Sequence, residues 1–216
     1  MALNKLKFNS LNVTPTAGKT IGFNSSADGL EATLSGGSMT FIKKLTASSS
    51  STLSFVNGSS DVVLDNTYKE YVFMFKDIHT STEALFSFNF RDGSTDYDAT
   101  KTTSFFYAYQ NEAGNSSGVQ YAGYDLNQGT GFQQIGDNLD ADNDHCLTGF
   151  LHLFNPSSTT FVKHFRGTIQ FNSENGQSTN SFVAGYNNVT AAIDAVQFKM
   201  STGNIDAGTI TLYGIN

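Results

Sequence analysis

The chain has 216 residues, a net charge of −7 and only 14 % charged residues, whereas 13 % are aromatic, a composition typical of strands and tight turns. It has no basic run, so it lacks the positive surface that nucleic acids require, and its single cysteine excludes a disulfide framework within the chain. No apolar run is long enough to cross a bilayer and residues 1–10 lack the apolar core of a secretory signal, so we expect neither a nucleic-acid partner nor membrane insertion.

Residues 1–38 are predicted to form an extended arm. Large apolar residues are scattered in this segment among Asn, Ser, Thr and Gly: Leu3, Leu6, Phe8, Leu11, Val13, Ile21 and Phe23. So few apolar residues cannot form a hydrophobic core by themselves. We therefore expect the arm to dock on other chains of an assembly. The alternative is that it forms the first strand and loop of the main domain.

From Met39 onwards the strand signals become regular. Runs of apolar and β-branched residues separated by turns predict strands over 39–46, 52–56, 61–64, 68–78, 84–91, 103–110, 147–154, 160–170, 181–186, 195–200 and 208–215. Asn57-Gly58 is a strong hairpin signal between two of them. Because helical periodicity is almost absent, we predict that residues 39–216 fold as an antiparallel β-sandwich or jelly roll.

The densest apolar stretch, residues 147–170, is predicted to be a β-hairpin with a turn over 155–159. Both faces of its first strand are apolar, so we expect a central strand that is covered on both sides. Alternation in strand 68–78 predicts Tyr71, Phe73 and Phe75 on one face, and Val72 and Met74 on the other. The phenylalanines expected to point into the sandwich are Phe73, Phe88, Phe150 and Phe165.

Residues 111–146 are polar and rich in glycine, with short strands predicted near 119–124 and 132–135. Excursions of this length in a compact domain often bind partners, so we expect an outward, partner-facing surface. Tyr121, Tyr124 and Phe132 are its candidate contacts, because aromatic rings stack on the apolar faces of sugars. In the strand before it, Tyr107 and Tyr109 are further candidates. The alternatives are a disordered insertion and ordinary strand tyrosines.

Asp140, Asp142 and Asp144 have the spacing of the first three ligands of an EF-hand calcium loop. The sixth position is His145 rather than Gly and the twelfth is Leu151 rather than Glu, so the stretch is not an EF-hand. Two interpretations stay open: a looser structural calcium site, which would be the protein's only cofactor, and a solvated acidic loop without an ion.

Nothing in the sequence is typical of an enzyme. It has no nucleophile elbow, phosphate loop or dinucleotide fingerprint, and its carboxylates show no recognisable pairing. His152 and His164 lie on the two strands of the predicted hairpin, where with a carboxylate they would suit a transition metal. The alternative is that they are two ordinary histidines on a sheet.

Three segments resemble a known protein family: YKEYVFMFKDIH, GFLHLFNPSSTTFVKHF and FKMSTGNIDAGTITLYGI. The chain resembles virion proteins from tailed phages of marine bacteria, especially cyanophages, in which a jelly-roll body ends in the strand found here at residues 208–215. The resemblance implies a tail fibre, a head or neck appendage, or a capsid decoration. Such a protein would dock on other virion proteins through residues 1–38.

We therefore expect a virion surface protein that displays a jelly roll, either to adhere to glycans of the host surface or to reinforce the particle. The family resemblance also favours a homotrimer or a symmetric array. Two alternatives from other functional classes are a free carbohydrate-binding module and a polysaccharide depolymerase.

Overall fold

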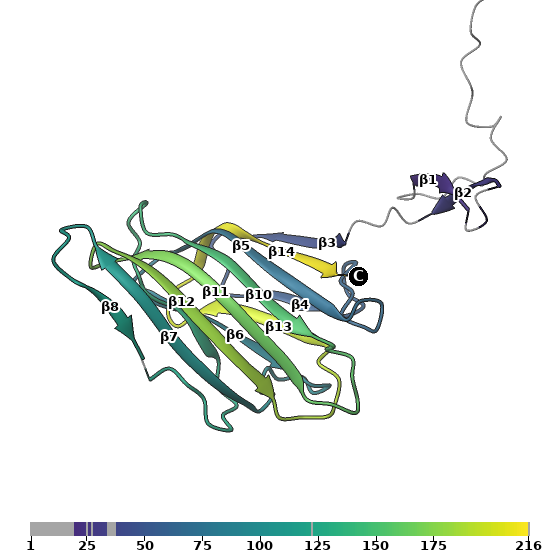
Figure 1. Cartoon of the computed structure of the whole chain (residues 1–216). Coiled ribbons are helices and arrows are strands. Elements are labelled where there is room, and N and C mark those ends of the chain that lie inside the picture. Colours follow the sequence, from purple (N-terminus) through teal and green to yellow (C-terminus); the bar gives the residue numbers. More distant parts are fainter. Residues whose placement is uncertain (1–19, 25, 27, 34–37, 122, 216) are drawn as a thin grey trace, which may run out of the picture. The chain divides into compact units, whose positions relative to one another are not determined.

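The structure is a computed structural model that describes residues 20–24, 26, 28–33, 38–121 and 123–215. By its internal contacts the chain divides into two compact units, residues 1–38 and 39–216, at the same residue as the predicted end of the arm. Every regular element in the described ranges is a β-strand (Figure 1). No helix that could span a membrane occurs in these ranges.

In the first unit the structure describes a small β-hairpin. Strand β1 (Thr20–Phe23) pairs antiparallel with β2 (Leu30–Thr33), and the amide of Asn24 donates to the carbonyl of Gly29 at 2.9 Å. The hairpin leaves apolar residues exposed, most of all Phe23 at 74 %. The other apolar residues of the predicted arm, from Leu3 to Val13, lie outside the described residues.

The second unit is a sandwich of two antiparallel sheets (Figure 1). The order of the eight-stranded sheet is β3-β14-β5-β10-β11-β12-β7-β8, and that of the four-stranded sheet is β4-β13-β6-β9. The strands are β3 Met39–Thr46, β4 Leu53–Val56, β5 Glu70–Thr80, β6 Ala84–Arg91, β7 Lys101–Asn111, β8 Ser117–Gln120, β9 Gln133–Leu139, β10 Leu147–Phe154, β11 Lys163–Ser173, β12 Gln177–Asn187, β13 Ala195–Met200 and β14 Ile205–Ile215.

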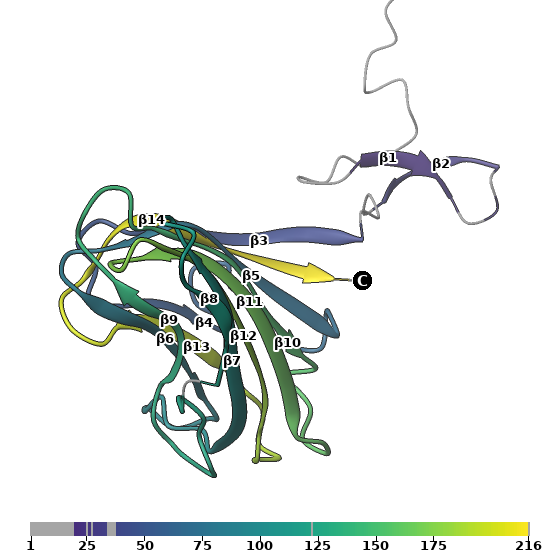
Figure 2. The same ribbon diagram turned by 60° about the vertical axis from the view of Figure 1, so that its left-hand side comes forward.

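The chain changes sheet at most of its connections. From β3 to β7 it alternates between the eight-stranded and the four-stranded sheet, and it alternates again from β12 to β14. Among the described strands of the sandwich, only the hairpins β7–β8 and β10–β11–β12 stay within one sheet. Winding of this kind is typical of a jelly roll, so the predicted all-β sandwich fold is confirmed. Figure 2 shows the larger sheet curving around the smaller one.

Phenylalanine rings fill the space between the sheets. Phe198 of β13 is fully buried, and its ring centroid lies 5.2 Å from that of Phe75 and 5.4 Å from that of Phe73. Three more rings lie within 6.4 Å of it: Phe55, Phe86 and Phe88. Most of these pairs are tilted or edge-to-face, which the charge distribution of aromatic rings favours. Tyr71, Phe73 and Phe75 of β5 are buried and Met74 is exposed, as the predicted alternation requires, but Val72, which was predicted on the same face as Met74, is buried as well.

Strand β10 turns its leucines toward the core. Leu151 and Leu153 are fully buried, whereas Phe150 is half-buried on the outer face. Leu153 lies directly opposite the buried Phe165 of β11, and residues that face each other across two strands share one side of the sheet. The prediction of a central strand is therefore confirmed, but covering on both faces and the inward orientation of Phe150 were wrong. The other phenylalanines predicted to point inward are buried: Phe73, Phe88 and Phe165.

A bulge interrupts β5 at Asp77. This residue has a φ of 51°, and the pairing of β5 shifts here against both β10 and β14. Gly208 of β14 fits closely against the bulge, because a Cβ at Gly208 would lie 2.3 Å from the carbonyl oxygen of Asp77. Its φ of 104° also requires glycine. Bulges re-aim the side chains that follow them, and His79 follows this one.

Two regions differ from the predicted strands. Residues 61–64 form no strand, and β4 pairs with β13 instead of forming a hairpin after Asn57-Gly58. Val62 and Leu64 are nevertheless buried, so this turn contributes to the core. Within 111–146 the two expected short strands are present as β8 and β9, but β9 is longer than predicted and belongs to the four-stranded sheet.

Candidate functional site

A pocket lies where the four-stranded sheet ends. The edge strand of the four-stranded sheet, β9, packs on β11 and β12 of the large sheet. The next strands of the large sheet, β7 and β8, therefore extend past β9, and their inner faces are not covered by it. A pocket of about 160 Å³ at this position is lined by Tyr107, Tyr109, Gln120, Asp137, Asn138, Phe171, Ser173, Asn175, Gln177 and Thr179. We call it the tyrosine pocket. It is smaller than the roughly 300–1,000 Å³ of sites for drug-sized ligands, which suits the insertion of one small polar ring.

Strand register assembles the aromatic wall of the tyrosine pocket. Tyr107 and Tyr109 lie two residues apart on β7, hence on one face, with ring centroids 6.1 Å apart. Gln120 of β8 lies directly opposite Tyr107, whose hydroxyl donates to Gln120 Oε1 at 2.6 Å. Gly118 lies opposite Tyr109, where a Cβ would be 3.5 Å from the ring. Because Gly118 has no side chain, it leaves that part of the Tyr109 ring uncovered.

The opposite wall of the pocket carries a carboxylate. Asp137 of β9 accepts a hydrogen bond from the hydroxyl of Tyr124 at 2.9 Å. Burial raises the pKa of Asp137, and burial together with this hydrogen bond raises the pKa of Tyr124 to about 12. Tyr124 therefore stays protonated at neutral pH and keeps donating. Burial also raises the pKa of Tyr107, and the negative charge of Asp137 adds to the effect.

The pocket also contains a buried hydroxyl group, that of Ser173, without a hydrogen-bond partner among the described residues. A buried hydroxyl of this kind carries a free-energy penalty unless a ligand or a water molecule bonds to it. A ligand rich in hydroxyl groups would find the carboxylate of Asp137, the amide of Gln120 and the hydroxyl of Ser173 as partners, with tyrosine rings for its apolar face.

The three aromatic residues predicted to bind within 111–146 are separated by the fold. Tyr121 is 66 % exposed. Tyr124 is partly buried and its ring packs on Phe105, with centroids 5.5 Å apart, so it is not free to stack on a ligand as predicted. Phe132 is half-buried, and the ammonium of Lys199 lies 4.1 Å from its ring centroid. None of the three is among the described residues that line the tyrosine pocket.

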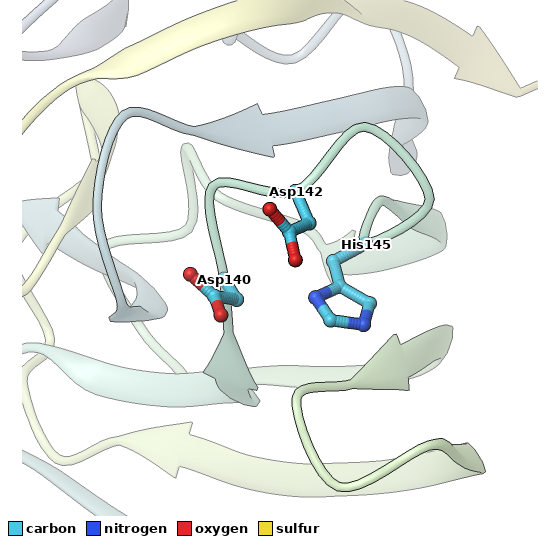
Figure 3. Close-up of side chains that lie close together, drawn as sticks. All are labelled: Asp140, Asp142 and His145. Carbon is cyan, nitrogen blue, oxygen red and sulfur yellow. The ribbon is translucent and has the colours of Figure 1, made fainter.

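The three predicted calcium ligands do not come together as a set. Asp140, Asp142 and His145 each place one ligand atom within 4.8 Å of the others (Figure 3). Among the described residues, no other group of three or more His, Cys, Asp or Glu side chains meets this geometry. Asp144 is 81 % exposed and lies 4.0 Å from Nε2 of His145. We call Asp140, Asp142 and His145 the Asp–His cluster.

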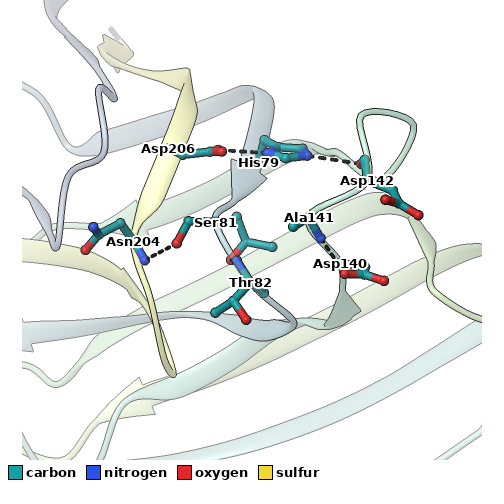
Figure 4. Close-up of polar contacts among 9 residues, drawn as sticks. His79, Ser81, Thr82, Asp140, Ala141, Asp142, Asn204 and Asp206 are labelled. Atoms are coloured by element: carbon teal, nitrogen blue, oxygen red, sulfur yellow. Dashed lines mark hydrogen bonds and ion pairs between the residues drawn. The ribbon is translucent and has the colours of Figure 1, made fainter.

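His79 of β5 links the loop that carries the Asp–His cluster to the large sheet by hydrogen bonds (Figure 4). Its Nδ1 is 2.8 Å from Oδ1 of Asp206 on β14, and its Nε2 is 3.1 Å from the backbone carbonyl oxygen of Asp142. Burial lowers the pKa of His79, but the hydrogen bonds to Asp206 and Asp142, together with the negative charges of Asp206 and Asp140, outweigh burial and raise the pKa. A protonated ring donates from both nitrogens, which matches two oxygen partners.

The outer face of the large sheet has a second, more apolar hollow of about 410 Å³. Phe106 and Phe182 stack there with centroids 4.9 Å apart, and Phe106 is 40 % exposed. His152 lines the same hollow and bonds through Nδ1 to the carboxylate of Glu70. The described residues contain no metal-binding group that includes His152 or His164, so the alternative of a metal held by these two histidines finds no support.

Sequence reasoning found only part of the tyrosine pocket. Tyr107 and Tyr109 were candidates because tyrosine rings stack on the apolar faces of sugars. Gln120, Asp137 and Ser173 were not, because they come from three other strands and no local pattern links them. Only the strand order and register bring them together.

The chain was compared with family models, with curated proteins and with solved structures, and nothing matches it in any of the three.

Proposed function

We propose that the protein is a structural component of a phage virion surface whose β-sandwich attaches the particle to host glycans. The observation that carries the adhesive part is the tyrosine pocket, where two tyrosine rings, the amide of Gln120 and the carboxylate of Asp137 converge. Apolar ring faces combined with a few polar groups are the means by which proteins orient sugars. The placement on a virion rests on the resemblance of residues 208–215 and two other segments to phage proteins.

Residues 1–38 would dock this domain on other virion proteins. In the described part of this segment Ile21, Phe23 and Leu30 are 39 %, 74 % and 41 % exposed. Apolar side chains gathered on an exposed surface are typical of interaction sites. The proposal includes a homotrimer or a symmetric array, which light scattering on the free protein and subunit counting in the particle would measure.

Binding without catalysis fits the pocket better than hydrolysis. Asp137 is the one carboxylate among the described residues that line it, whereas most glycoside hydrolases use a pair of carboxylates across the scissile bond. A polysaccharide depolymerase remains the alternative, and release of reducing ends from host polysaccharide would support it. A free carbohydrate-binding module would bind the same glycan but be missing from purified particles.

The binding test uses the full chain and polysaccharide from host cells in a calorimetric titration. The double variant Tyr109→Ala, Gln120→Ala should weaken binding by about tenfold or more, because loss of a binding anchor costs about 1–3 kcal/mol. Tyr121→Ala is the matched control, since it removes an exposed tyrosine that does not line the pocket. Equal affinity of the double variant and the original protein would exclude the tyrosine pocket as the glycan site.

The location test is separate. Mass spectrometry of purified particles should find the chain at a fixed copy number that matches a symmetric site on the tail, neck or capsid. Absence from washed, infective particles would reject the virion role while leaving glycan binding to be judged by the titration.

A further inference from the structure

We propose that Asp140, Asp142 and His145 bind a divalent transition-metal ion of the Zn²⁺ class, which closes the loop between β9 and β10. The two carboxylates and the imidazole come from six consecutive residues, and the fold brings one ligand atom of each within 4.8 Å of the others. This ligand set differs from the calcium set predicted from sequence, because His145 replaces Asp144. The proposal does not depend on glycan binding.

His145 is the independent observation that points to an ion. Its side chain is only 11 % exposed, and its Nδ1 is buried without a hydrogen-bond partner among the described residues. Figure 3 shows a nitrogen of this ring turned toward the two carboxylates. A buried ring nitrogen without a partner is unfavourable, and so are two carboxylates side by side without a cation. One metal ion would satisfy all three groups.

The chemistry of the ligands selects the class of ion. Ca²⁺ and Mg²⁺ take oxygen ligands almost exclusively, six to eight of them for Ca²⁺. An imidazole together with carboxylates suits Zn²⁺ and related transition metals, which bind nitrogen and need fewer ligands. Three protein ligands leave one tetrahedral position for a water molecule.

The loop is held near this geometry by the protein itself. His79 bonds to the carbonyl of Asp142, and the amide of Ala141 donates to Oδ1 of Asp140 at 2.6 Å (Figure 4). Within the same loop, the carbonyl of Asp144 accepts a hydrogen bond from the side chain of Asn172 on β11. Fixed partners of this kind orient the groups around a metal and favour its binding.

Little movement is needed for an ion to bind. Ligand atoms around a tetrahedral zinc ion lie about 3.4 Å apart when each bond is about 2.1 Å long. The separations here are at most 4.8 Å, so the ligand atoms would approach one another by at most about 1.4 Å. Rotation of the exposed Asp142 side chain is sufficient for much of this.

The test uses the full chain without an affinity tag, treated with EDTA and dialysed, and titrated with ZnCl2, MnCl2 or CaCl2 alone. We expect one saturable zinc site per chain and a thermal midpoint that rises with zinc concentration. His145→Gln and Asp140→Asn should each weaken zinc binding at least tenfold. Asp144→Asn and His164→Gln are controls for charge and for adventitious histidine binding, and both should stay within threefold of the original affinity.

Three results would overturn the proposal: no saturable zinc binding, unchanged affinity in His145→Gln, or calcium binding tighter than zinc. If the His145 and Asp140 variants do not fold, cobalt gives a reading on the unaltered chain. Four-coordinate Co²⁺ absorbs visible light much more strongly than hydrated Co²⁺, so bound cobalt should give strong visible absorption that zinc abolishes by displacing it. A chain that shows no such absorption would also refute the site.

Discussion

Replacement of Phe198 by alanine would remove the ring at the centre of the aromatic core. The side chain is fully buried and lies within 6.4 Å of five other rings. Truncation of a core Phe to Ala costs about 3–5 kcal/mol in total, and this range already includes the aromatic pairs that are lost, each worth about 0.5–1.5 kcal/mol. The number of pairs therefore decides where in the range a given Phe falls. Because Phe198→Ala removes five pairs, we expect a loss of about 4–5 kcal/mol, a large part of the roughly 5–15 kcal/mol that stabilises a domain.

Equilibrium unfolding in urea measures this loss, provided the slope of unfolding free energy against urea stays constant between variants. The matched control is Phe150→Ala, the same change on a central strand but on the outer face, where the half-buried ring should contribute only about 1–2 kcal/mol. A loss below about 2 kcal/mol for Phe198→Ala would refute the central role of this ring. An equally large loss for Phe150→Ala would show that the orientation of β10 is reversed.

Three further predictions concern a buried charge, a glycine and the arm. Lys101 is fully buried, with Nζ donating to the carbonyl of Ala99 at 2.9 Å, and burial lowers its pKa from 10.5 to about 8. Between these pH values the unfolded chain binds more protons than the folded chain, so the free energy of unfolding should rise by about 3 kcal/mol from pH 8 to 10.5 relative to Lys101→Met. Urea unfolding at several pH values measures this, and the same change in unfolding free energy with pH for both chains would contradict the prediction. Gly208→Ala should destabilise by about 1–3 kcal/mol more than Gly58→Ala, because both have a positive φ but only Gly208 meets the backbone of Asp77; equal midpoints in urea would argue against the close approach. A fragment of residues 39–216 should show a cooperative thermal transition, and an unfolded fragment would mean that the arm is part of the fold.

The sequence predicted strands best where apolar and polar residues alternate on one buried face. In β5, Tyr71, Phe73 and Phe75 share the inner face, so both the strand and its orientation could be predicted. In β10 both faces are apolar, and nothing local decides whether Phe150 or Leu151 points inward. Pairing with β11 decides it, because the outer face of β11 carries Arg166 and the inner face carries Phe165.

Strand β9 was underestimated because its buried residues are partly polar. Gln133 is fully buried and accepts a hydrogen bond from the hydroxyl of Thr103 at 2.6 Å. An amide satisfied in this way behaves as a core residue, although its chemistry predicts a surface position. The Asp–His cluster was predicted in part, since the spacing of Asp140 and Asp142 was informative. The third member of the cluster is His145 rather than Asp144 because of the conformation of the loop, and the spacing of residues along the sequence does not predict that conformation.

The pairing of the first and last strands of the sandwich governs when this domain can fold during synthesis. Strand β14 lies between β3 and β5, and Ile215 is the register partner of Met39. Closing so long a loop has an entropic cost that grows with its length, and non-local pairing of this kind slows folding. On the ribosome, the large sheet cannot be completed until Ile215 has emerged. A nascent chain that stalls before Ile205 would leave β3 and β5 without the strand that joins them, two unpaired edges that invite association with other chains.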